Sequence, residues 1–239
     1  MISATYKGRD LEAMAFAPNY HGWILDRFRP YLGRRVAEIG AGTGNFARLL
    51  LDERIDTLHL IEPSTAMFRQ LSAVARDEPA GRVVLHNAVF LAVAPQLKTG
   101  DVDSIIYVNV LEHIAEDERE LRAMSAVLPR GGRIFIFVPA LPCLFGSHDR
   151  AVGHVRRYWR RDLAAKCRAA GFTILHAGYF DVAGIVPWWI KYCVLRSNRM
   201  EAGAVRVYDR LVVPVMSRLE AWLPPPLGKN IILVAEKSN

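Results

Sequence analysis

The chain has 239 residues, of which 51% are hydrophobic and 23% are charged, so its composition excludes global disorder and allows a sizeable buried core. The net charge of +7 is compatible with a nucleic acid, an anionic membrane surface or an acidic small molecule as partner, and does not choose among them. The three cysteines include no CxxC pair, which argues against a disulfide framework and a Cys-based zinc site. We find neither a signal peptide nor an apolar run of the ~20 residues that a membrane span needs, so we expect a cytoplasmic protein.

The predicted elements alternate between short apolar strands and longer helical patterns. Residues 20–32 predict a first helix that ends at Gly33. Val- and Ile-rich runs predict strands at 35–39, 57–61, 83–86, 104–109 and 133–138, with helices between them that include 46–52, 65–76 and 117–127. Continuous apolar runs are typical of strands buried on both faces of a parallel sheet. This alternation predicts right-handed βαβ units in a doubly wound α/β fold.

The pattern changes after the fifth predicted strand. Residues 172–179 and 230–237 predict a sixth and a seventh strand, separated by about fifty residues of helical patterning with several prolines. Such an excursion fits a last strand that is antiparallel and inserted between its neighbours. We therefore expect a single domain over 1–239 with a seven-stranded, mostly parallel sheet, an N-terminal helical segment at 1–32 and a helical insertion at 180–226.

The strongest functional motif is a glycine-rich turn after the first predicted strand. Gly40, Gly42 and Gly44 allow a sharp turn and a close approach of a ligand, and the helix that follows directs N–H groups towards it. Glu62 ends the second predicted strand, where a carboxylate can accept hydrogen bonds from both hydroxyls of a ribose. A dinucleotide fingerprint would need glycine in place of Asn45.

Glu38 adds a second carboxylate at the end of the first predicted strand. A carboxylate at this position would repel a pyrophosphate and would neutralise a cationic group. The alternative is a glycine-rich turn that binds no ligand, but the strand before it and the acid after it argue against that interpretation.

With these motifs in this order, the sequence resembles the class I S-adenosylmethionine-dependent methyltransferases over about residues 20–180 and the last strand. The resemblance implies a Rossmann-like methyltransferase fold with S-adenosylmethionine as cofactor. It implies that the glycine loop holds the methionine part above Glu38, that Glu62 holds the ribose, and that residues after the third strand flank the adenine. The positions that it assigns to the cofactor are Glu38, Gly40, Ala41, Gly42, Gly44, Glu62, Pro63, Asn87, Ala88 and Asn109.

Two departures qualify the resemblance. The family usually has Asp where this chain has Asn87. Because an amide oxygen can still accept a hydrogen bond from the adenine amino group, we expect weaker adenine recognition. Residues 107–114, which resemble the segment under the cofactor, lack the [DN]PPY motif of methyltransferases that act on exocyclic amino groups of bases. We therefore expect no nucleic acid as a partner.

Candidates for acceptor chemistry come from the loops after the fourth and fifth predicted strands, because ligands of open α/β sheets bind beyond the carboxyl ends of strands. Methyl transfer depends on orientation and needs a general base only for some acceptors. Glu112 and His113 follow the fourth strand, and the fifth is followed by His148, Asp149, His154 and Tyr158. The candidates for catalysis are His113, His148, His154 and Tyr158.

Each of these candidates has a structural alternative. His113 could pack at a helix start beside the cofactor, and the others could anchor their loop to the sheet. Two histidines and an aspartate could also bind a metal, but no diagnostic spacing is present, so we expect no metal.

Two further features bear on the acceptor. Residues 148–168 contain seven Arg or Lys and two Asp, which predicts either a solvated helix or a site for an anionic substrate or lipid headgroups. The insertion is rich in aromatic residues beside basic ones, and this pattern fits a lid or acceptor pocket, a dimer contact or a contact with a membrane surface.

We therefore expect a methyltransferase that transfers a methyl group from S-adenosylmethionine to a small molecule with an apolar body, either anionic or lipid-like. The alternatives are an RNA or protein methyltransferase, suggested by net charge alone, and a non-catalytic S-adenosylmethionine-binding module. A homodimer and a peripheral membrane contact also stay open as partners.

Overall fold

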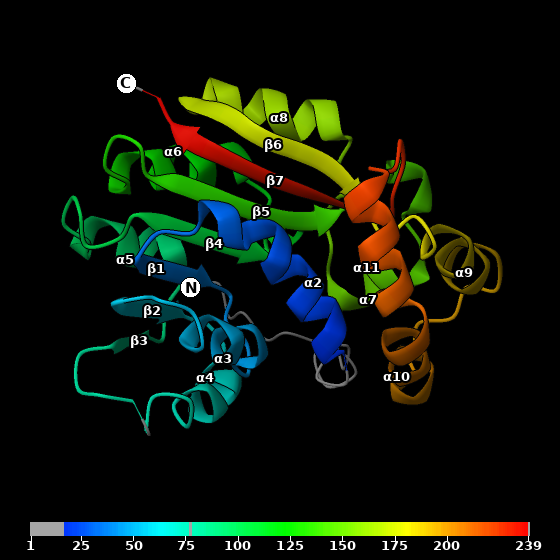
Figure 1. Cartoon of the computed structure of the whole chain (residues 1–239), viewed down its shortest axis with the longest axis horizontal. Coiled ribbons are helices and arrows are strands. Elements are labelled where there is room, and N and C mark those ends of the chain that lie inside the picture. The colour runs from blue at the N-terminus through cyan, green and yellow to red at the C-terminus, as the bar shows by residue number, and fades with distance from the viewer. Residues whose placement is uncertain (1–16, 77, 239) are drawn as a thin grey trace.

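A seven-stranded sheet forms the centre of the molecule, with the strand order β3-β2-β1-β4-β5-β7-β6 (Figure 1). The computed structural model describes residues 17–76 and 78–238. The strands are β1 (Arg35–Ile39), β2 (Thr57–Ile61), β3 (Val83–His86), β4 (Ser104–Val108), β5 (Arg133–Pro139), β6 (Phe172–Phe180) and β7 (Asn230–Lys237). Strand β7 is antiparallel to both β5 and β6, between which it lies, and the pairs from β3 to β5 are parallel. The predicted fold class and the inserted last strand are confirmed.

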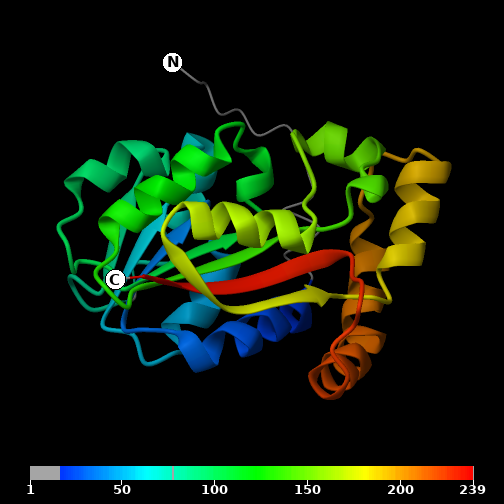
Figure 2. The same ribbon diagram turned by 90° about the horizontal axis from the view of Figure 1, so that it is seen from above.

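Helices cover both faces of this sheet (Figure 2). On one face lie α2 (Pro18–Phe28), α3 (Asn45–Leu51) and α4 (Thr65–Leu71). On the other face lie α5 (Phe90–Val93), α6 (Asp117–Val127) and α8 (Arg160–Ala169). Short 3-10 turns occur at η1 (Arg29–Tyr31), η2 (Ala94–Gln96), η3 (Leu111–His113) and η4 (Pro142–Leu144).

The continuous apolar strands are explained by burial on both faces. Successive side chains of a strand point to opposite faces. In β5, Ile134 and Ile136 pack with the α6 and α8 side, whereas Phe135 and Phe137 pack with the α2 side. Phe28 of α2 meets Phe135 edge to face at a centroid distance of 5.2 Å. A polar residue in such a strand would be buried whichever way it pointed.

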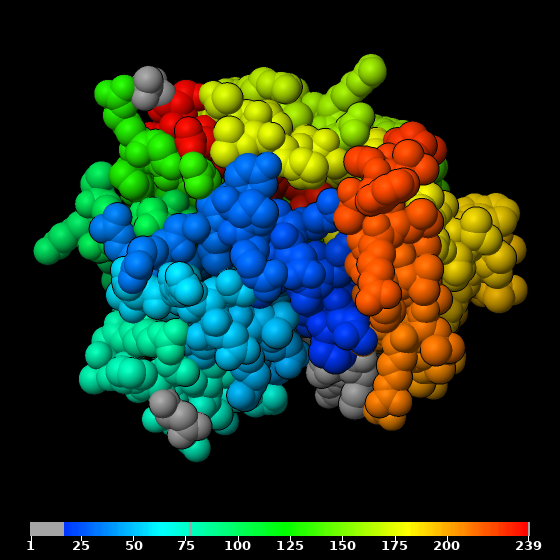
Figure 3. Space-filling model, viewed as in Figure 1, coloured from blue at the N-terminus to red at the C-terminus, as the bar shows by residue number. Residues whose placement is uncertain are grey.

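The insertion is helical, as predicted. It contains α9 (Ile185–Trp188), the π-helical segment η5 (Trp189–Val194), α10 (Ala202–Leu211) and α11 (Val213–Trp222). Helices α10 and α11 contact α2, and Figure 3 shows them side by side on the face that it draws. Segment η5 contacts α7 (Ser147–Val152).

Buried carboxylates connect the insertion to the rest of the domain. Asp209 of α10 accepts hydrogen bonds from the backbone N–H of Tyr20 at 2.8 Å and from the side chain of Asn19 at 3.0 Å, at the start of α2. Glu220 of α11 accepts from the N–H groups of Asp181 and Val182 at 3.1 and 2.9 Å. The insertion is therefore packed against the domain through specific polar contacts.

Some helix boundaries differ from those predicted. The helical segment predicted at 1–32 is described from residue 17 onward, as α2 followed by η1, and residues 1–16 lie outside the described part. Helix α4 ends at Leu71, before the predicted end at residue 76. The chain turns there through i to i+3 hydrogen bonds, and Val74 packs against the backbone of Gly44. The end of α4 is set by tertiary packing, which cannot be predicted from the apolar periodicity of the sequence. In the described part of the chain, no helix has the length and apolar character to cross a membrane.

Candidate functional site

The predicted site residues gather at the edge of the sheet where the parallel strands end. Ile39 of β1 pairs with Ile61 of β2 and with Tyr107 of β4, so these strands end at the same level. The chain leaves β4 through Asn109, whose φ of 54° is in the left-handed region that asparagine tolerates better than most residues. This turn carries the chain into η3, beside the glycine loop.

The glycine loop is tightly fitted between its neighbours. A Cβ atom on Gly40 would lie 2.5 Å from Cγ2 of Val110, and one on Gly44 would lie 2.5 Å from Cγ2 of Val74. The N–H groups of Gly40 and Ala41 donate to the carbonyl of Ile61 at 2.8 and 3.2 Å. These two N–H groups are therefore already hydrogen-bonded within the protein. The contribution of the two residues to ligand binding is that they let a ligand approach the backbone closely.

Glu62 connects the end of β2 to this loop. Its Oε2 accepts from the N–H of Gly42 at 2.9 Å, and its Oε1 accepts from the N–H of Ser64 at 2.7 Å. Burial raises the pKa of Glu62, while the two N–H donors act in the opposite direction. Each carboxylate oxygen can accept more than one hydrogen bond, so both remain able to accept from a hydroxyl.

Asn87 directly follows β3 and lies at the same edge of the sheet. Its Nδ2 donates to the carbonyls of Glu62 at 2.8 Å and Pro63 at 3.3 Å. Its Oδ1 accepts from the hydroxyl of Thr65 at 3.3 Å. An aspartate here would place a carboxylate against two carbonyl oxygens, so the amide is explained by its contacts. Ala88 packs against the core on the α6 side.

Glu38 is buried beneath the loop, with 3% of its surface exposed. Burial and the nearby charge of Glu62 raise the pKa of Glu38 to about 8. Its Oε2 has no hydrogen-bond partner among the described residues. A buried polar atom of this kind is costly unless a ligand, ion or water completes it. The orphaned oxygen and the close-fitting glycines fit a ligand that carries a cationic group, as S-adenosylmethionine does.

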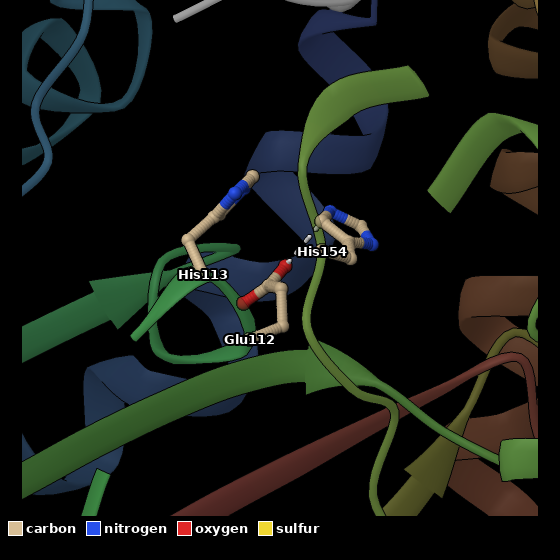
Figure 4. Close-up of side chains that lie close together, drawn as sticks. All are labelled: Glu112, His113 and His154. Carbon is tan, nitrogen blue, oxygen red and sulfur yellow. Dashed lines mark ion pairs between the residues drawn. The ribbon is translucent and has the colours of Figure 1, made fainter. Parts of the chain in front are cut away.

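A second cluster lies at the ends of β4 and β5 and consists of Glu112, His113 and His154 (Figure 4). Glu112 is fully buried, and its Oε1 lies 3.7 Å from Nε2 of His154. The rings of His113 and His154 meet edge to face with centroids 4.6 Å apart. Burial raises the pKa of Glu112 to about 7. We call these three residues the Glu-His cluster.

One backbone hydrogen bond and two side-chain contacts hold this cluster in place. The N–H of Val155 donates to the carbonyl of Glu112 at 2.9 Å. Nδ1 of His154 lies 2.8 Å from Oδ1 of Asp149, which also accepts from Nε of Arg157 at 2.9 Å. The loop that carries His154 is therefore fixed to η3 on one side and to α7 on the other.

Tyr158 and His148 lie outside the Glu-His cluster. The buried hydroxyl of Tyr158 donates to Asp117 at 2.9 Å and lies 3.2 Å from the carbonyl of Leu111. Burial and the charge of Asp117 raise the pKa of Tyr158 well above its usual range. His148 is buried and packs against the rings of Trp188 and Tyr192, at 5.3 and 4.9 Å. Both positions anchor their segments.

Several basic residues of segment 148–168 are paired inside the protein. Arg156 lies 2.7 Å from Asp117, and Lys166 lies 2.8 Å from the same carboxylate. Arg157 is almost completely buried between Asp149 and the ring of Trp188. These pairs account for part of the local charge without an anionic ligand.

Glu112 stands in the sequence among the residues that could supply a base, but within this cluster only His113 and His154 were predicted as catalytic residues. Glu112 precedes His113 directly, which is a signal in the sequence. Nothing in the sequence indicates that His154 meets them, because that contact depends on the pairing of β4 with β5 and on the loop that follows.

Comparison with known proteins shows the family to which the chain belongs. A family model described as a methyltransferase domain matches residues 16–177. The match includes the glycine loop, Glu62, Asn87 and the Glu-His cluster, and it ends before the insertion.

Two curated relatives are methyltransferases by name. The chain is 28% identical over 130 residues to an uncharacterized methyltransferase from Geobacillus sp., a match that covers 54% of this chain and 57% of that protein. It is 24% identical over 189 residues to a tRNA U34 carboxymethyltransferase from Psychrobacter arcticus, which covers 72% of this chain and 54% of that protein. The matches thus span little more than half the length of these relatives.

Solved structures share the fold. An S-adenosylmethionine-dependent methyltransferase from Archaeoglobus fulgidus has a TM-score of 0.62 at 18% identity, over 95% of this chain and 99% of that one. The 1,6-didemethyltoxoflavin-N1-methyltransferase from Burkholderia thailandensis has a TM-score of 0.61 at 17% identity, over 100% of this chain and 85% of that one. The chain therefore belongs to the methyltransferase-domain family, within the class I S-adenosylmethionine-dependent methyltransferases, whose cofactor is S-adenosylmethionine.

Proposed function

We propose that this protein transfers a methyl group from S-adenosylmethionine to a small molecule with an apolar body. The observation that carries the proposal is the arrangement of two buried carboxylates, Glu38 and Glu62, around the glycine loop, with the Glu-His cluster at the neighbouring strand ends. When bound, the cofactor supplies an electrophilic methyl group on a positively charged sulfur.

The residues of the first three strand ends hold the cofactor in this proposal. Glu38 neutralises a cationic group, and Glu62 accepts hydrogen bonds from the ribose hydroxyls while it keeps its contact with Gly42. Oδ1 of Asn87 accepts from the adenine amino group, because its Nδ2 is already used on two carbonyls. The walls of the cofactor site are formed by Ala41, Pro63, Ala88 and Asn109.

The Glu-His cluster and the insertion form the acceptor side. Trp188 of the insertion packs over Arg157, Arg157 binds Asp149, and Asp149 binds His154. This chain of contacts connects the insertion to the cluster. Because the family match ends at residue 177, the insertion is the part of this single domain suited to select the acceptor.

Exposed side chains of the insertion support an apolar acceptor body. Trp189 and Ile190 of η5 are exposed, as are Val194 and Leu195 that follow them. The internal pairing of Arg157 and Lys166 weakens the case for an anionic acceptor. Apolar contacts would orient such an acceptor, and orientation supplies much of the acceleration of methyl transfer.

Incubation with labelled S-adenosylmethionine and fractionated metabolites tests the proposal. We expect label in a small-molecule fraction, and calorimetry should show binding of S-adenosylmethionine and none of NAD. Tight binding of the cofactor without transfer to any fraction would favour a non-catalytic binding module instead.

An RNA acceptor is the second candidate, favoured by the match to a protein named as a tRNA carboxymethyltransferase. Phosphate contacts make binding steeply dependent on salt. If labelled RNA fractions appear and RNA affinity falls about 10³-fold between low and moderate salt, the small-molecule proposal is wrong.

A further inference from the structure

We propose that Glu112, His113 and His154 bind one divalent transition-metal ion at the acceptor side of the sheet edge. Two imidazoles and one carboxylate form a donor set that proteins use for such ions, in the His₂Glu zinc sites and in the 2-His-1-carboxylate iron sites. The claim of metal binding does not depend on the proposed function, whereas the use of the ion on an acceptor rests on it.

One pair of donor atoms in the cluster is close to the spacing of metal ligands, and the third donor lies nearby. One donor atom from each residue lies within 4.8 Å of the other two. Nε2 of His154 and Oε1 of Glu112 are 3.7 Å apart. Two ligands of a tetrahedral ion with bonds of ~2.0–2.1 Å lie about 3.3 Å apart, so a small side-chain movement brings this pair to that separation. Figure 4 shows the three side chains lying close together, Glu112 and His113 from η3 and His154 from the loop before α8.

Asp149 orients the ring of His154 for metal binding. Its Oδ1 lies 2.8 Å from Nδ1 of His154, and because a carboxylate oxygen accepts, Nδ1 donates its N–H there, which leaves the lone pair of the neutral ring on Nε2. Nε2 is the nitrogen that faces Glu112. A histidine that binds a metal usually donates its other N–H to a carboxylate in this way, which orients the ring and raises its basicity.

The environment of Glu112 also points to a missing cation. Both of its carboxylate oxygens are buried without a hydrogen-bond partner among the described residues. Arg157 and Asp149, whose opposite charges act on Glu112 in opposite directions, are paired with each other. A buried, unsatisfied carboxylate requires an explanation, and a bound cation provides one.

Three protein ligands leave at least one coordination position open, which is the arrangement of catalytic rather than structural metal sites. An ion at this position would bind a hydroxyl oxygen of the acceptor and lower its pKa, so that its proton passes to solvent. The oxygen would then form a bond to the methyl carbon as the S–C bond of the cofactor breaks, which leaves S-adenosylhomocysteine. In that case the acceptor atom is an oxygen, and no side chain in the cluster acts as the base.

Titration of the untagged 239-residue chain, first freed of metal with a chelator, tests the site. Co²⁺ is followed by its visible absorption and Zn²⁺ by calorimetry. We expect one equivalent of each to bind, with absorption typical of Co²⁺ held by nitrogen and oxygen ligands. Glu112→Gln and His154→Ala should each weaken Zn²⁺ binding by at least about tenfold, and Asp149→Asn by about 10–100-fold.

A second pair of histidines provides a matched control. Nδ1 of His59 and Nε2 of His86 lie 3.2 Å apart on β2 and β3, away from the cluster. The variant with His59→Gln and His86→Gln should bind Co²⁺ and Zn²⁺ with unchanged affinity. Thermal unfolding and the affinity for S-adenosylhomocysteine show that each variant is folded.

The outcomes separate the possibilities. If metal binding is lost in the His59 and His86 variant and kept in Glu112→Gln, the proposed site is wrong and the binding belongs to the other pair. If folded wild-type protein binds neither ion more tightly than millimolar, the proposal is overturned, and normal cofactor binding in the same sample leaves the proposed function intact.

Discussion

The N–H of Gly42 donates to Oε2 of Glu62 across 2.9 Å, so the carboxylate at the end of β2 also holds the glycine loop after β1. Glu62 therefore supports the loop and, in our proposal, binds the ribose. A substitution there acts on both, and its effect on cofactor affinity should exceed that of a residue that only contacts the ligand.

Glu62→Ala should weaken the binding of S-adenosylmethionine without unfolding the protein. Loss of charge-assisted hydrogen bonds costs about 1.5–3 kcal/mol, which is roughly ten- to hundredfold in affinity. Calorimetry measures the affinity, and Glu116→Gln on the surface serves as a control because its ion pair with Arg119 is exposed. Wild-type affinity in Glu62→Ala would remove Glu62 from the cofactor site.

Gly42→Ala should reduce cofactor affinity more than it reduces stability. The φ of Gly42 is 56°, so a side chain there adds strain of about 1–2 kcal/mol and also projects from the loop. Gly131→Ala is the matched control, because Gly131 has a φ of 75° and a Cβ on it would meet nothing within 4 Å. Both variants should lose similar thermal stability, and equal cofactor affinity in the two would refute the role of the loop.

Glu38→Gln should stabilise the cofactor-free protein more at pH 8 than at pH 5. The pKa of Glu38 is raised from 4.5 to about 8, so the folded state binds a proton that the unfolded state releases in this window. The wild type therefore loses stability as the pH rises from 4.5 to about 8, by at most ~1.4 kcal/mol for each pH unit. Thermal unfolding of both proteins at several pH values checks this, and parallel curves would contradict it.

The raised pKa of Glu38 also predicts that the protein releases a proton when the cofactor binds. A cationic group beside Glu38 favours its ionised form and lowers its pKa. At pH 7 the wild type should then release a proton when S-adenosylmethionine binds, and Glu38→Gln should not. Calorimetry in buffers with different ionisation enthalpies measures the proton, and equal heats in all buffers for the wild type would place the cation elsewhere.

Tyr158→Phe should lower stability by about 1 kcal/mol and leave cofactor affinity within about twofold. The hydroxyl is buried between Asp117 and the backbone of Leu111, and Asp117 keeps its contacts with Arg156 and Lys166 when the hydroxyl is removed. Turnover should fall only slightly and independently of pH. A pH-dependent loss of about 10²-fold would instead show that Tyr158 takes part in proton transfer.

Asp209→Ala should destabilise the packing of the insertion on α2. Asp209 accepts from the first N–H groups of α2, and loss of such a cap costs about 0.5–2 kcal/mol. Hydrogen exchange should increase at the start of α2 and in α10. Arg210→Ala, at an exposed neighbouring position, should change neither. Unchanged exchange in Asp209→Ala would show that apolar contacts alone hold the insertion.

The apolar patterning of the sequence determined the fold. All seven predicted strands agree with the structure to within one residue at each end, because continuous Val- and Ile-rich runs are stable only when both faces are covered. The glycine loop and Glu38 were recognised because they lie within one strand and its turn, and Glu62 was recognised because it ends the next predicted strand. Local chemistry suffices for such motifs.

Tertiary structure decided which distant residues meet. Glu112 and His154 belong to different strand ends, and only the parallel pairing of β4 with β5 and the hydrogen bond from Val155 to Glu112 bring them together. The same packing made Tyr158, a predicted catalytic candidate, a buried partner of Asp117, and made Arg157, one of the basic residues of segment 148–168, a buried partner of Asp149. A contact between residues far apart in the chain depends on how every element between them packs. No local sequence pattern contains that information.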